Sequence, residues 1–248
     1  GKNPEMLVIG YLYNQGFIKK TEDLQSVQVY WDVESAVVVT RGGISNLEKR
    51  LEKRTVTSGC GQGTVFGDMM EDLDKIKLNS PALRQSSFYR LLKNIREYNE
   101  VYKKSGAVHG CALCKDEKIE IFIEDVGRHN ATDAIAGYML LEQIDGSDKL
   151  FYTTGRLTSE MVIKVAQMGI PVLFSRAGIT KMGLELSQKL GVTTISRAAG
   201  KHFLVYNGAE TVIYDAKPSE KTDSRFHSSE SSEESSVHER RRGAELST

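Results

Sequence analysis

The chain contains the stretch Ile121-Phe-Ile-Glu-Asp-Val-Gly-Arg-His-Asn-Ala-Thr-Asp-Ala-Ile-Ala-Gly137, which runs from an apolar segment through a polar turn into a helical pattern. Residues 121–123 are bulky and favour a strand, whereas Asp133, Ile135 and Met139 recur at helical spacing. Residues 124–130 therefore form a strand-to-helix junction, and such junctions point side chains away from the core. The stretch predicts an α/β fold with a functional site at this junction.

The polar turn holds five hydrogen-bonding side chains within seven residues: Glu124, Asp125, Arg128, His129 and Asn130. These are too many donors and acceptors to satisfy one another inside a core, so we expect a ligand to meet some of them. A simpler interpretation stays open. In it, Asp125 or Asn130 caps the following helix, and Arg128 pairs with Glu124.

Strands and helices alternate regularly after this junction. Apolar runs predict strands at 150–153, 172–175, 193–195 and 204–206, and helical patterns occupy 158–168 and 180–190. Strands that alternate with helices of this length indicate right-handed βαβ crossovers. The sequence therefore predicts a parallel or mixed sheet.

An arginine follows three of these strands, at Arg156, Arg176 and Arg197. The carboxyl ends of strands in an open α/β sheet carry the ligand, and guanidinium groups match phosphate and the edge of guanine. Together with Arg128, these residues predict an anionic, nucleotide-like ligand. The alternative is that they are ordinary solvated surface arginines.

The first part of the chain is less regular. A helix is expected from Pro4 to about Gly16, and a short helix at 46–53. Residues 27–31 and 36–40 predict a hairpin or two adjacent strands. An amphipathic helix follows at 88–102, and a second hairpin joins 108–114 to 119–123. We predict an N-terminal α+β domain at 1–87 and an α/β domain at 88–216. Residues 217–248 are rich in Ser, Glu and Arg, and we expect a disordered tail.

Cys60 lies in the glycine-rich segment Thr57-Ser-Gly-Cys-Gly-Gln-Gly-Thr64. The neighbouring glycines leave the thiol with little side-chain cover and a freely turning backbone, which suits transfer chemistry. A glycine-rich turn with an incidental thiol is the alternative. A phosphate-binding loop is a weaker one, because the required Lys and Ser/Thr spacing is missing.

The other two cysteines, Cys111 and Cys114, have a spacing that often indicates zinc or redox chemistry. On a strand, however, Cys111 shares a face with His109, whereas Cys114 points to the opposite face. We therefore expect Cys114 to be structural. A closed zinc site needs four ligands, and only Cys60, His109, Cys111 and His129 are candidates, so no metal is predicted.

Composition excludes several classes of protein. The 248 residues are 40% hydrophobic and carry a formal net charge of zero, so they predict a globular protein that does not bind duplex nucleic acid. No apolar run is long enough to cross a bilayer, and no signal segment is recognisable. We expect a cytoplasmic protein that does not interact with membranes.

Three ordered motifs carry a family resemblance. Gly106-Ala-Val-His109, Glu124-Asp-Val-Gly-Arg-His-Asn130 and Gly155-Arg-x-x-Ser159-Glu-Met resemble the FdhD family, the accessory sulfurtransferases of formate dehydrogenases. The resemblance extends from Asn3 to Val212. It implies a cytidine-deaminase-like, three-layer α/β/α C-terminal domain and a smaller N-terminal α+β domain. The leading β segment that the family has before the first helix is not found in this sequence.

The resemblance also implies a function. FdhD-like proteins carry persulfide sulfur from a cysteine desulfurase to the molybdenum bis-guanine-dinucleotide cofactor of formate dehydrogenase. The family's persulfide cysteine falls on Cys60, whereas the second cysteine of its Cys-x-x-Cys loop is replaced by Gly63. This replacement puts a relay between two thiols of that loop in doubt.

Further site residues follow from the same comparison and from the arginine pattern. The family's cofactor-binding turn corresponds to Ala198, Ala199, Gly200, Lys201, His202 and Phe203. We expect Arg128, Arg156, Arg176 and Lys201 to contact phosphate or guanine. His109, Glu124, Asp125 and His129 are expected to shape the pocket.

Two other functions stay open. One is a non-catalytic chaperone for the molybdopterin nucleotide, in which Cys60 is idle. The other is a zinc-dependent deaminase, which the implied fold suggests, although His109-Gly-Cys111 lacks the glutamate that a deaminase needs. Whether the chain forms a homodimer is also left open.

Overall fold

The computed structural model describes residues 3–44, 54–56, 63–65, 73 and 75–216. The described residues up to Asp215 form one compact unit. The predicted short helix at 46–53 and the predicted tail at 217–248 lie outside the described residues. None of the helices in the described ranges has the length and apolar character that a bilayer span requires.

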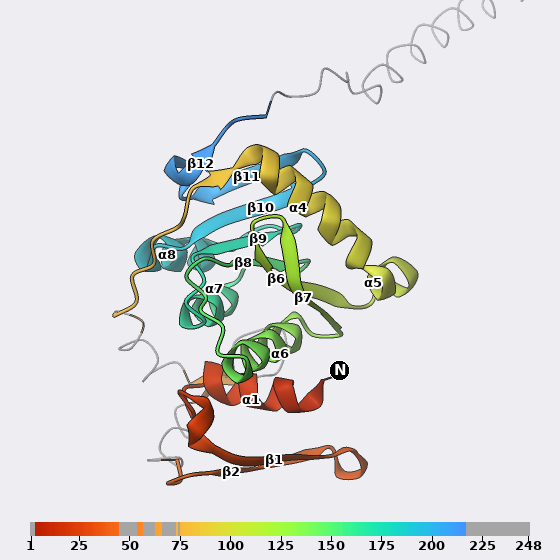
Figure 1. Cartoon of the computed structure of the whole chain (residues 1–248), viewed down its shortest axis with the longest axis vertical. Coiled ribbons are helices and arrows are strands. Elements are labelled where there is room, and N and C mark those ends of the chain that lie inside the picture. The colour runs from red at the N-terminus through yellow and green to blue at the C-terminus, as the bar shows by residue number, and fades with distance from the viewer. Residues whose placement is uncertain (1–2, 45–53, 57–62, 66–72, 74, 217–248) are drawn as a thin grey trace, which may run out of the picture. The chain divides into compact units, whose positions relative to one another are not determined.

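A six-stranded mixed sheet forms the centre of this unit, with the strand order β11-β10-β9-β8-β6-β7 (Figure 1). Three neighbouring strands are parallel, and each of the other three runs antiparallel to a neighbour, which confirms the predicted mixed sheet. The strands are β6 (His109–Lys115), β7 (Lys118–Asp125), β8 (Leu150–Thr153), β9 (Val172–Ser175), β10 (Thr193–Ala199) and β11 (His202–Asn207).

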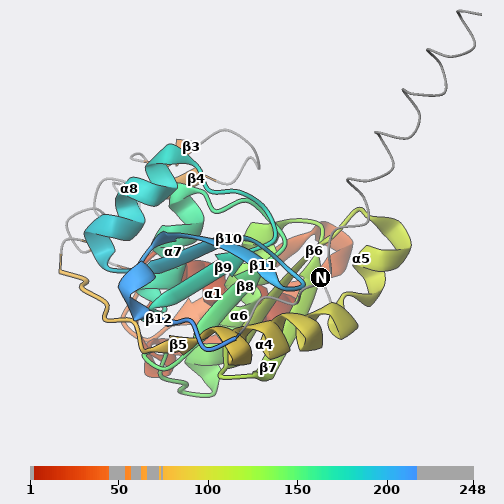
Figure 2. The same ribbon diagram turned by 90° about the horizontal axis from the view of Figure 1, so that it is seen from above.

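Helices cover both faces of this sheet. The amphipathic helix α4 (Gln85–Tyr98) buries Phe88, Leu91 and Ile95 against one face. The other face is covered by α6 (Arg128–Leu141), α7 (Ser159–Gln167) and α8 (Lys181–Leu190). Figure 2 shows the sheet between these helices. The arrangement confirms the predicted three-layer α/β/α architecture and is compatible with a cytidine-deaminase-like fold.

The prediction of one continuous helix over 88–102 is wrong, because two helices occupy this region. α4 ends at Tyr98, and a separate short helix, α5 (Glu100–Ser105), follows. The break occurs at Asn99, whose ψ of 58° is incompatible with a continuing helix. Gly106 then ends α5 with a φ of 63°, a conformation that glycine adopts without strain.

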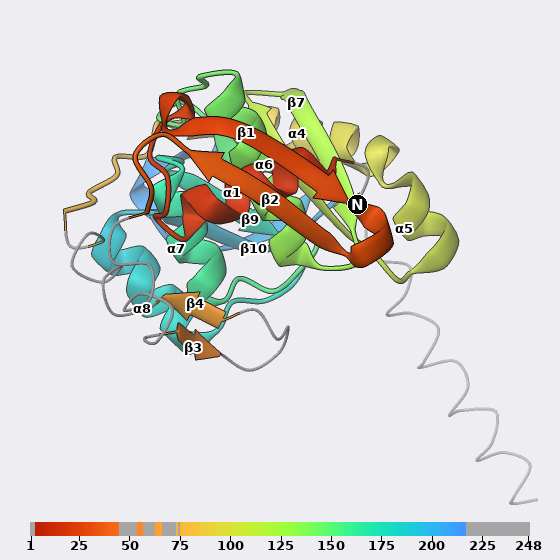
Figure 3. The ribbon, with the colours of Figure 1, turned by 90° about the horizontal axis from the view of Figure 1, so that it is seen from below.

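The N-terminal helix α1 (Pro4–Asn14) lies against α6, and the predicted hairpin, β1 (Leu24–Tyr30) and β2 (Ser35–Thr40), lies beyond α1 (Figures 1 and 3). Two glycines let the helices touch through their backbones. A Cβ atom on Gly10 would lie 1.7 Å from the Asp133 carbonyl oxygen, and one on Gly137 would lie 2.0 Å from the Met6 carbonyl oxygen. The predicted boundary between an N-terminal domain at 1–87 and an α/β domain at 88–216 stays a prediction.

Short elements complete the described chain. Two small sheets pair β3 with β4 in antiparallel and β5 with β12 in parallel. The remaining elements are β3 (Arg54–Val56), β4 (Gly63–Val65), β5 (Leu83–Arg84), β12 (Val212–Ile213) and the 3-10 helices η1 (Thr21–Asp23), η2 (Trp31–Val33) and η3 (Ala209–Thr211).

We predict that Gly137→Ala lowers the free energy of unfolding by about 1–3 kcal/mol, because the added methyl group forces α1 away from α6. Urea denaturation measures this change. Gly178→Ala is the matched control, since a Cβ atom there meets no heavy atom within 4 Å. Equal stability of the two variants would contradict the backbone contact.

Candidate functional site

The carboxyl ends of the parallel strands meet at one edge of the sheet. Thr153 pairs with Ser175, and Phe174 pairs with Ile195, so Arg156 and Arg176 follow strand ends at this edge, as predicted. Arg197 instead lies inside β10, because pairing with β11 extends this strand to Ala199, beyond the predicted end at residue 195. The antiparallel strands bring further residues there: Cys111 pairs with Thr153, and His109 pairs with Asp125. We call this edge the carboxyl rim.

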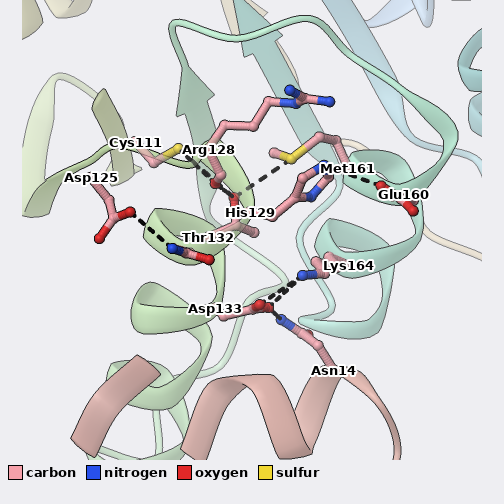
Figure 4. Close-up of polar contacts among 11 residues, drawn as sticks. Asn14, Cys111, Asp125, Arg128, His129, Thr132, Asp133, Glu160, Met161 and Lys164 are labelled. Atoms are coloured by element: carbon pink, nitrogen blue, oxygen red, sulfur yellow. Dashed lines mark hydrogen bonds and ion pairs between the residues drawn. The ribbon is translucent and has the colours of Figure 1, made fainter. Parts of the chain in front are cut away.

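The polar turn before α6 is held mainly by its own hydrogen bonds. The Asp125 carboxylate, labelled in Figure 4, has two close partners. It accepts from the Gly127 amide and from the Asn130 side chain, both at 3.0 Å. Asp125 therefore orders the loop that begins the helix, but the predicted cap by Asp125 or Asn130 is wrong, because the N-cap residue of α6 is Gly127.

Glu124 faces a different helix. Its carboxylate accepts from the amides of Val101 at 3.1 Å and Tyr102 at 2.8 Å, in the first turn of α5. These two bonds satisfy amides that a helix start leaves without partners, and they fix α5 beside the rim. The expectation that so many polar side chains need an external ligand is wrong for Glu124 and Asp125. Backbone amides of α5 satisfy Glu124, and groups of the turn itself satisfy Asp125.

Arg128 is the first residue of α6, and its side chain lies across Gly155 in the loop after β8. A Cβ atom on Gly155 would lie 2.4 Å from Arg128 Cδ. A side chain at this position would displace the arginine, so glycine lets Arg128 lie directly on the loop after β8. The same loop contributes Thr154, whose hydroxyl lies 3.2 Å from His109 Nδ1. Burial and the nearby Arg128 charge lower the pKa of His109.

Cys111 lies beneath this cluster. Its Sγ atom is 3.3 Å from Thr153 Oγ1 and 3.7 Å from the Arg128 carbonyl oxygen, and the side chain is buried. Burial raises the pKa of the thiol to about 11, although contacts with Thr153 and Thr132 act in the opposite direction. Cys111 is therefore a protonated thiol at neutral pH.

Cys114 belongs to the opposite face of the sheet. It packs in the core beneath α4, whereas Cys111 packs in the core beneath α6 and α7, so the predicted separation of the two cysteines is confirmed. Burial raises the pKa of Cys114 strongly. No group of three or more His, Cys, Asp and Glu side chains in the described part of the chain is arranged to hold a metal ion.

His129 is buried and faces the start of α7. Its Nε2 atom lies 3.1 Å from a Glu160 carboxylate oxygen (Figure 4). Burial lowers the pKa of His129 to about 3, and the positive charges of Lys164 and Arg128 act in the same direction. The imidazole is therefore neutral at pH 7 and works as a buried contact between α6 and α7.

Asp133 is fully buried one turn further along α6, and the sequence does not reveal its role. Its carboxylate accepts from Lys164 Nζ at 2.8 and 2.7 Å and from Asn14 Nδ2 at 2.7 Å (Figure 4). The charge is thus paired and hydrogen-bonded, as a buried charge must be. A polar residue on the apolar face of a helix was the only signal in the sequence, and it does not identify its partners.

A cavity of about 220 Å³ opens on the α4 side of the rim and collects several predicted residues. Its lining includes Arg176, Asn99 and Tyr152, and the three residues Ala198, Ala199 and Gly200. The Arg176 guanidinium carbon lies 5.8 Å from the centre of the Tyr102 ring. The predicted cofactor-binding residues therefore lie in two places. Arg176 and residues 198–200 line this cavity, whereas Arg128 begins α6 on the other face of the sheet.

The remaining predicted residues have other surroundings. Arg156, Lys201 and His202 are exposed. Phe203 packs in the core beneath α4, where its ring centroid lies 5.1 Å from that of Phe88, so this aromatic ring serves packing. Cys60 lies outside the described residues, in the segment 57–62 that connects β3 to β4 along the sequence.

The pKa of His129 predicts a pH dependence of stability. Between pH 3 and 6.5 the unfolded chain binds a proton that the folded His129 excludes, so stability falls as the pH drops through this range. His129 contributes up to about 1.4 kcal/mol per pH unit to this slope. Urea denaturation at several pH values measures this slope, and the variant His129→Gln should show a smaller slope of unfolding free energy against pH.

The exposed His202 provides the control. His202→Gln should keep the slope of the wild type. If His129→Gln and wild type lose stability equally between pH 6.5 and 4, His129 is not held neutral by burial.

The chain resembles known proteins over most of its length. Residues 1–213 match the FdhD/NarQ family. A relative from Bacillus pumilus is 31% identical over 202 residues, which cover 81% of this chain and 77% of the relative. A relative from Wolinella succinogenes is 33% identical over 201 residues, which cover 80% of this chain and 69% of the relative. Both are named sulfur carrier protein FdhD.

A solved structure has the same fold. It is a crystal structure from Desulfotalea psychrophila, of a protein assigned as a formate dehydrogenase accessory protein. The TM-score is 0.66 at 26% identity, and the match covers 85% of this chain and 80% of the other. The family match spans most of the chain and includes the rim, α6 and the start of α7. This chain therefore belongs to the FdhD/NarQ family.

Proposed function

We propose that this protein is a sulfurtransferase of formate dehydrogenase maturation. It carries sulfur as a persulfide on Cys60, receives it from a cysteine desulfurase, and passes it to the molybdenum bis-guanine-dinucleotide cofactor. Membership of the FdhD/NarQ family and the names of the sulfur carrier relatives support this function. A cytoplasmic location belongs to the same proposal, and a homodimer stays open.

The observation that carries the proposal is the state of the two described cysteines. Sulfur transfer needs a thiolate that can reach a donor. With a pKa of about 11, Cys111 is a thiolate in roughly one molecule in ten thousand at pH 7, and it is buried. Cys114 is buried as well, with a strongly raised pKa. The glycine-flanked Cys60 is the thiol whose sequence context suits the reaction.

The loading step is a thiol–disulfide exchange. The Cys60 thiolate attacks the terminal sulfur of the desulfurase persulfide, a new sulfur–sulfur bond forms on Cys60, and the desulfurase cysteine leaves as a thiolate. No net oxidation or reduction occurs. The step consumes no group of the rim, so the described site is available for the cofactor that receives the sulfur.

The cofactor is the substrate in this proposal, and the rim has the chemistry to bind its nucleotide part. Arg176 lines the cavity of about 220 Å³, which suits a base or a phosphate group rather than a whole dinucleotide. Arg128 begins α6 on the other face of the sheet, close to His109 and Thr154. We propose that Arg176 and residues 198–200 contact guanine or phosphate and that Arg128 contacts a further phosphate.

Sulfur loading tests the carrier role. After incubation with a cysteine desulfurase and cysteine, the wild type should gain the mass of one sulfur atom, mapped to Cys60. Cys60→Ala should gain none, whereas Cys111→Ala and Cys114→Ala should load like the wild type. Intact-protein mass spectrometry with peptide mapping measures this. Sulfur retained by Cys60→Ala would refute the assignment, and a wild type that binds nucleotide but gains no sulfur would favour the chaperone alternative.

Nucleotide binding tests the rim separately. Arg176→Ala should weaken GDP binding roughly tenfold to a hundredfold, because a charge-assisted hydrogen bond contributes about 1.5–3 kcal/mol. Isothermal titration calorimetry measures the affinity. The exposed Arg41, on the N-terminal segment after β2, provides the control variant Arg41→Ala, which should bind like the wild type. Unchanged affinity of Arg176→Ala would remove the cavity from the proposed site.

A further inference from the structure

The strand β7 lies at the end of the sheet. Among the described strands it pairs only with β6, so its second side offers backbone N–H and C=O groups that no described strand uses (Figure 1). Such an edge can accept another extended chain, and proteins usually protect edges that have no partner. β7 is eight residues long, which makes this a long edge.

A groove of about 780 Å³ runs along this edge. It touches the six consecutive residues 119–124. Because successive residues of a strand point to opposite faces of the sheet, a groove that touches all six follows the backbone edge rather than either face. Asn3 at the start of α1 borders it on one side, and the end of α4 and the start of α5 border it on the other.

The groove combines apolar and acidic groups. Tyr98 is 49% exposed and Val101 is 40% exposed, so apolar surface lies open to solvent at its border. Four of its lining residues are carboxylates, and none is Lys or Arg: Glu97, Glu100, Glu120 and Glu124. Glu120 also binds Lys149, and Glu124 caps α5, whereas Glu97 and Glu100 are exposed at the border.

We propose that β7 is the docking site for an extended, basic segment of a partner protein, which adds to the sheet as a further strand. Backbone hydrogen bonds to β7 would supply affinity, and Lys or Arg side chains facing the carboxylates would supply specificity. A second copy of this chain is a poor occupant. Symmetric pairing of β7 with itself would place the same carboxylates opposite one another.

The position of the groove connects it with the site. β7 ends at Asp125, which orders the loop leading to Arg128, and Glu124 holds α5 beside Arg176. A partner on β7 therefore sits next to the carboxyl rim. The inference uses only the edge, the groove and its charge, so it stands apart from the sulfur-carrier proposal.

Peptide binding to the full chain tests the inference. The probe is a fluorescein-labelled peptide as long as β7, with alternating lysine and valine. Fluorescence anisotropy should show saturable binding that weakens with added salt. Two matched peptides should bind far more weakly: one with glutamate in place of lysine, and one with alternate backbone nitrogens methylated, which removes strand hydrogen bonds.

Variants then locate the site. The double variant Glu97→Gln, Glu100→Gln should weaken binding of the lysine–valine peptide roughly threefold to tenfold, since each exposed charge at the border of the groove contributes up to about 1 kcal/mol. Glu142→Gln with Glu210→Gln is the matched control, because both residues are exposed and neither lines the groove. Hydrogen exchange should show that the peptide slows exchange of β7 amides in the wild type.

Several results would overturn the inference. These are no binding of the lysine–valine peptide, equal binding of the three peptides, equal effects of the two double variants, or no protection of β7. If β7 amides are protected without peptide and open only in a dilute monomer, the occupant is a second copy. If they open only when Arg240, Arg241 and Arg242 are replaced by glutamine, the chain's own tail is the occupant.

Discussion

One buried carboxylate holds the helices of the site together. Asp133 on α6 receives hydrogen bonds from Lys164 on α7 and from Asn14 on α1, all within 2.8 Å. A fully buried charge must be paired, and loss of one partner typically costs about 3–5 kcal/mol. This requirement fixes three helices in one arrangement. The contact between His129 and Glu160, one turn away, repeats the connection between α6 and α7.

The fixed helices determine where the polar turn points. Arg128 can lie across Gly155 only because α6 begins directly beside the end of β8, where a larger residue than glycine would collide with it. Asp125 orders the loop before this arginine, and Glu124 holds the first turn of α5. The acidic residues of the turn therefore serve as internal supports, and Arg128 lies between them and the loop that contains Gly155. Arg156 after β8 and Arg176 after β9 extend this basic character along the rim.

The sheet also divides the chemistry between its two faces. Cys111, His109 and Arg128 belong to the side of α6 and α7, whereas Arg176 and residues 198–200 belong to the side of α4. A substrate with two nucleotide parts could use both sides of one edge. The two thiols lie on different faces but behave alike, because burial on either face keeps Cys111 and Cys114 protonated. Burial that suits a packed core is unsuitable for a sulfur carrier.

The sequence by itself determined the strands of the central sheet, most helices and the edge at which Arg156 and Arg176 follow parallel strands, because these follow from local periodicity and from the direction of βαβ connections. It also separated Cys111 from Cys114, since strand geometry is local. Only the tertiary structure decided which polar groups were already satisfied. Asn14 reaches Asp133 across 119 positions of sequence, and Glu124 caps a helix more than 20 positions away. Hydrogen-bond partners depend on distances in space, and a helical or strand pattern carries no information about them.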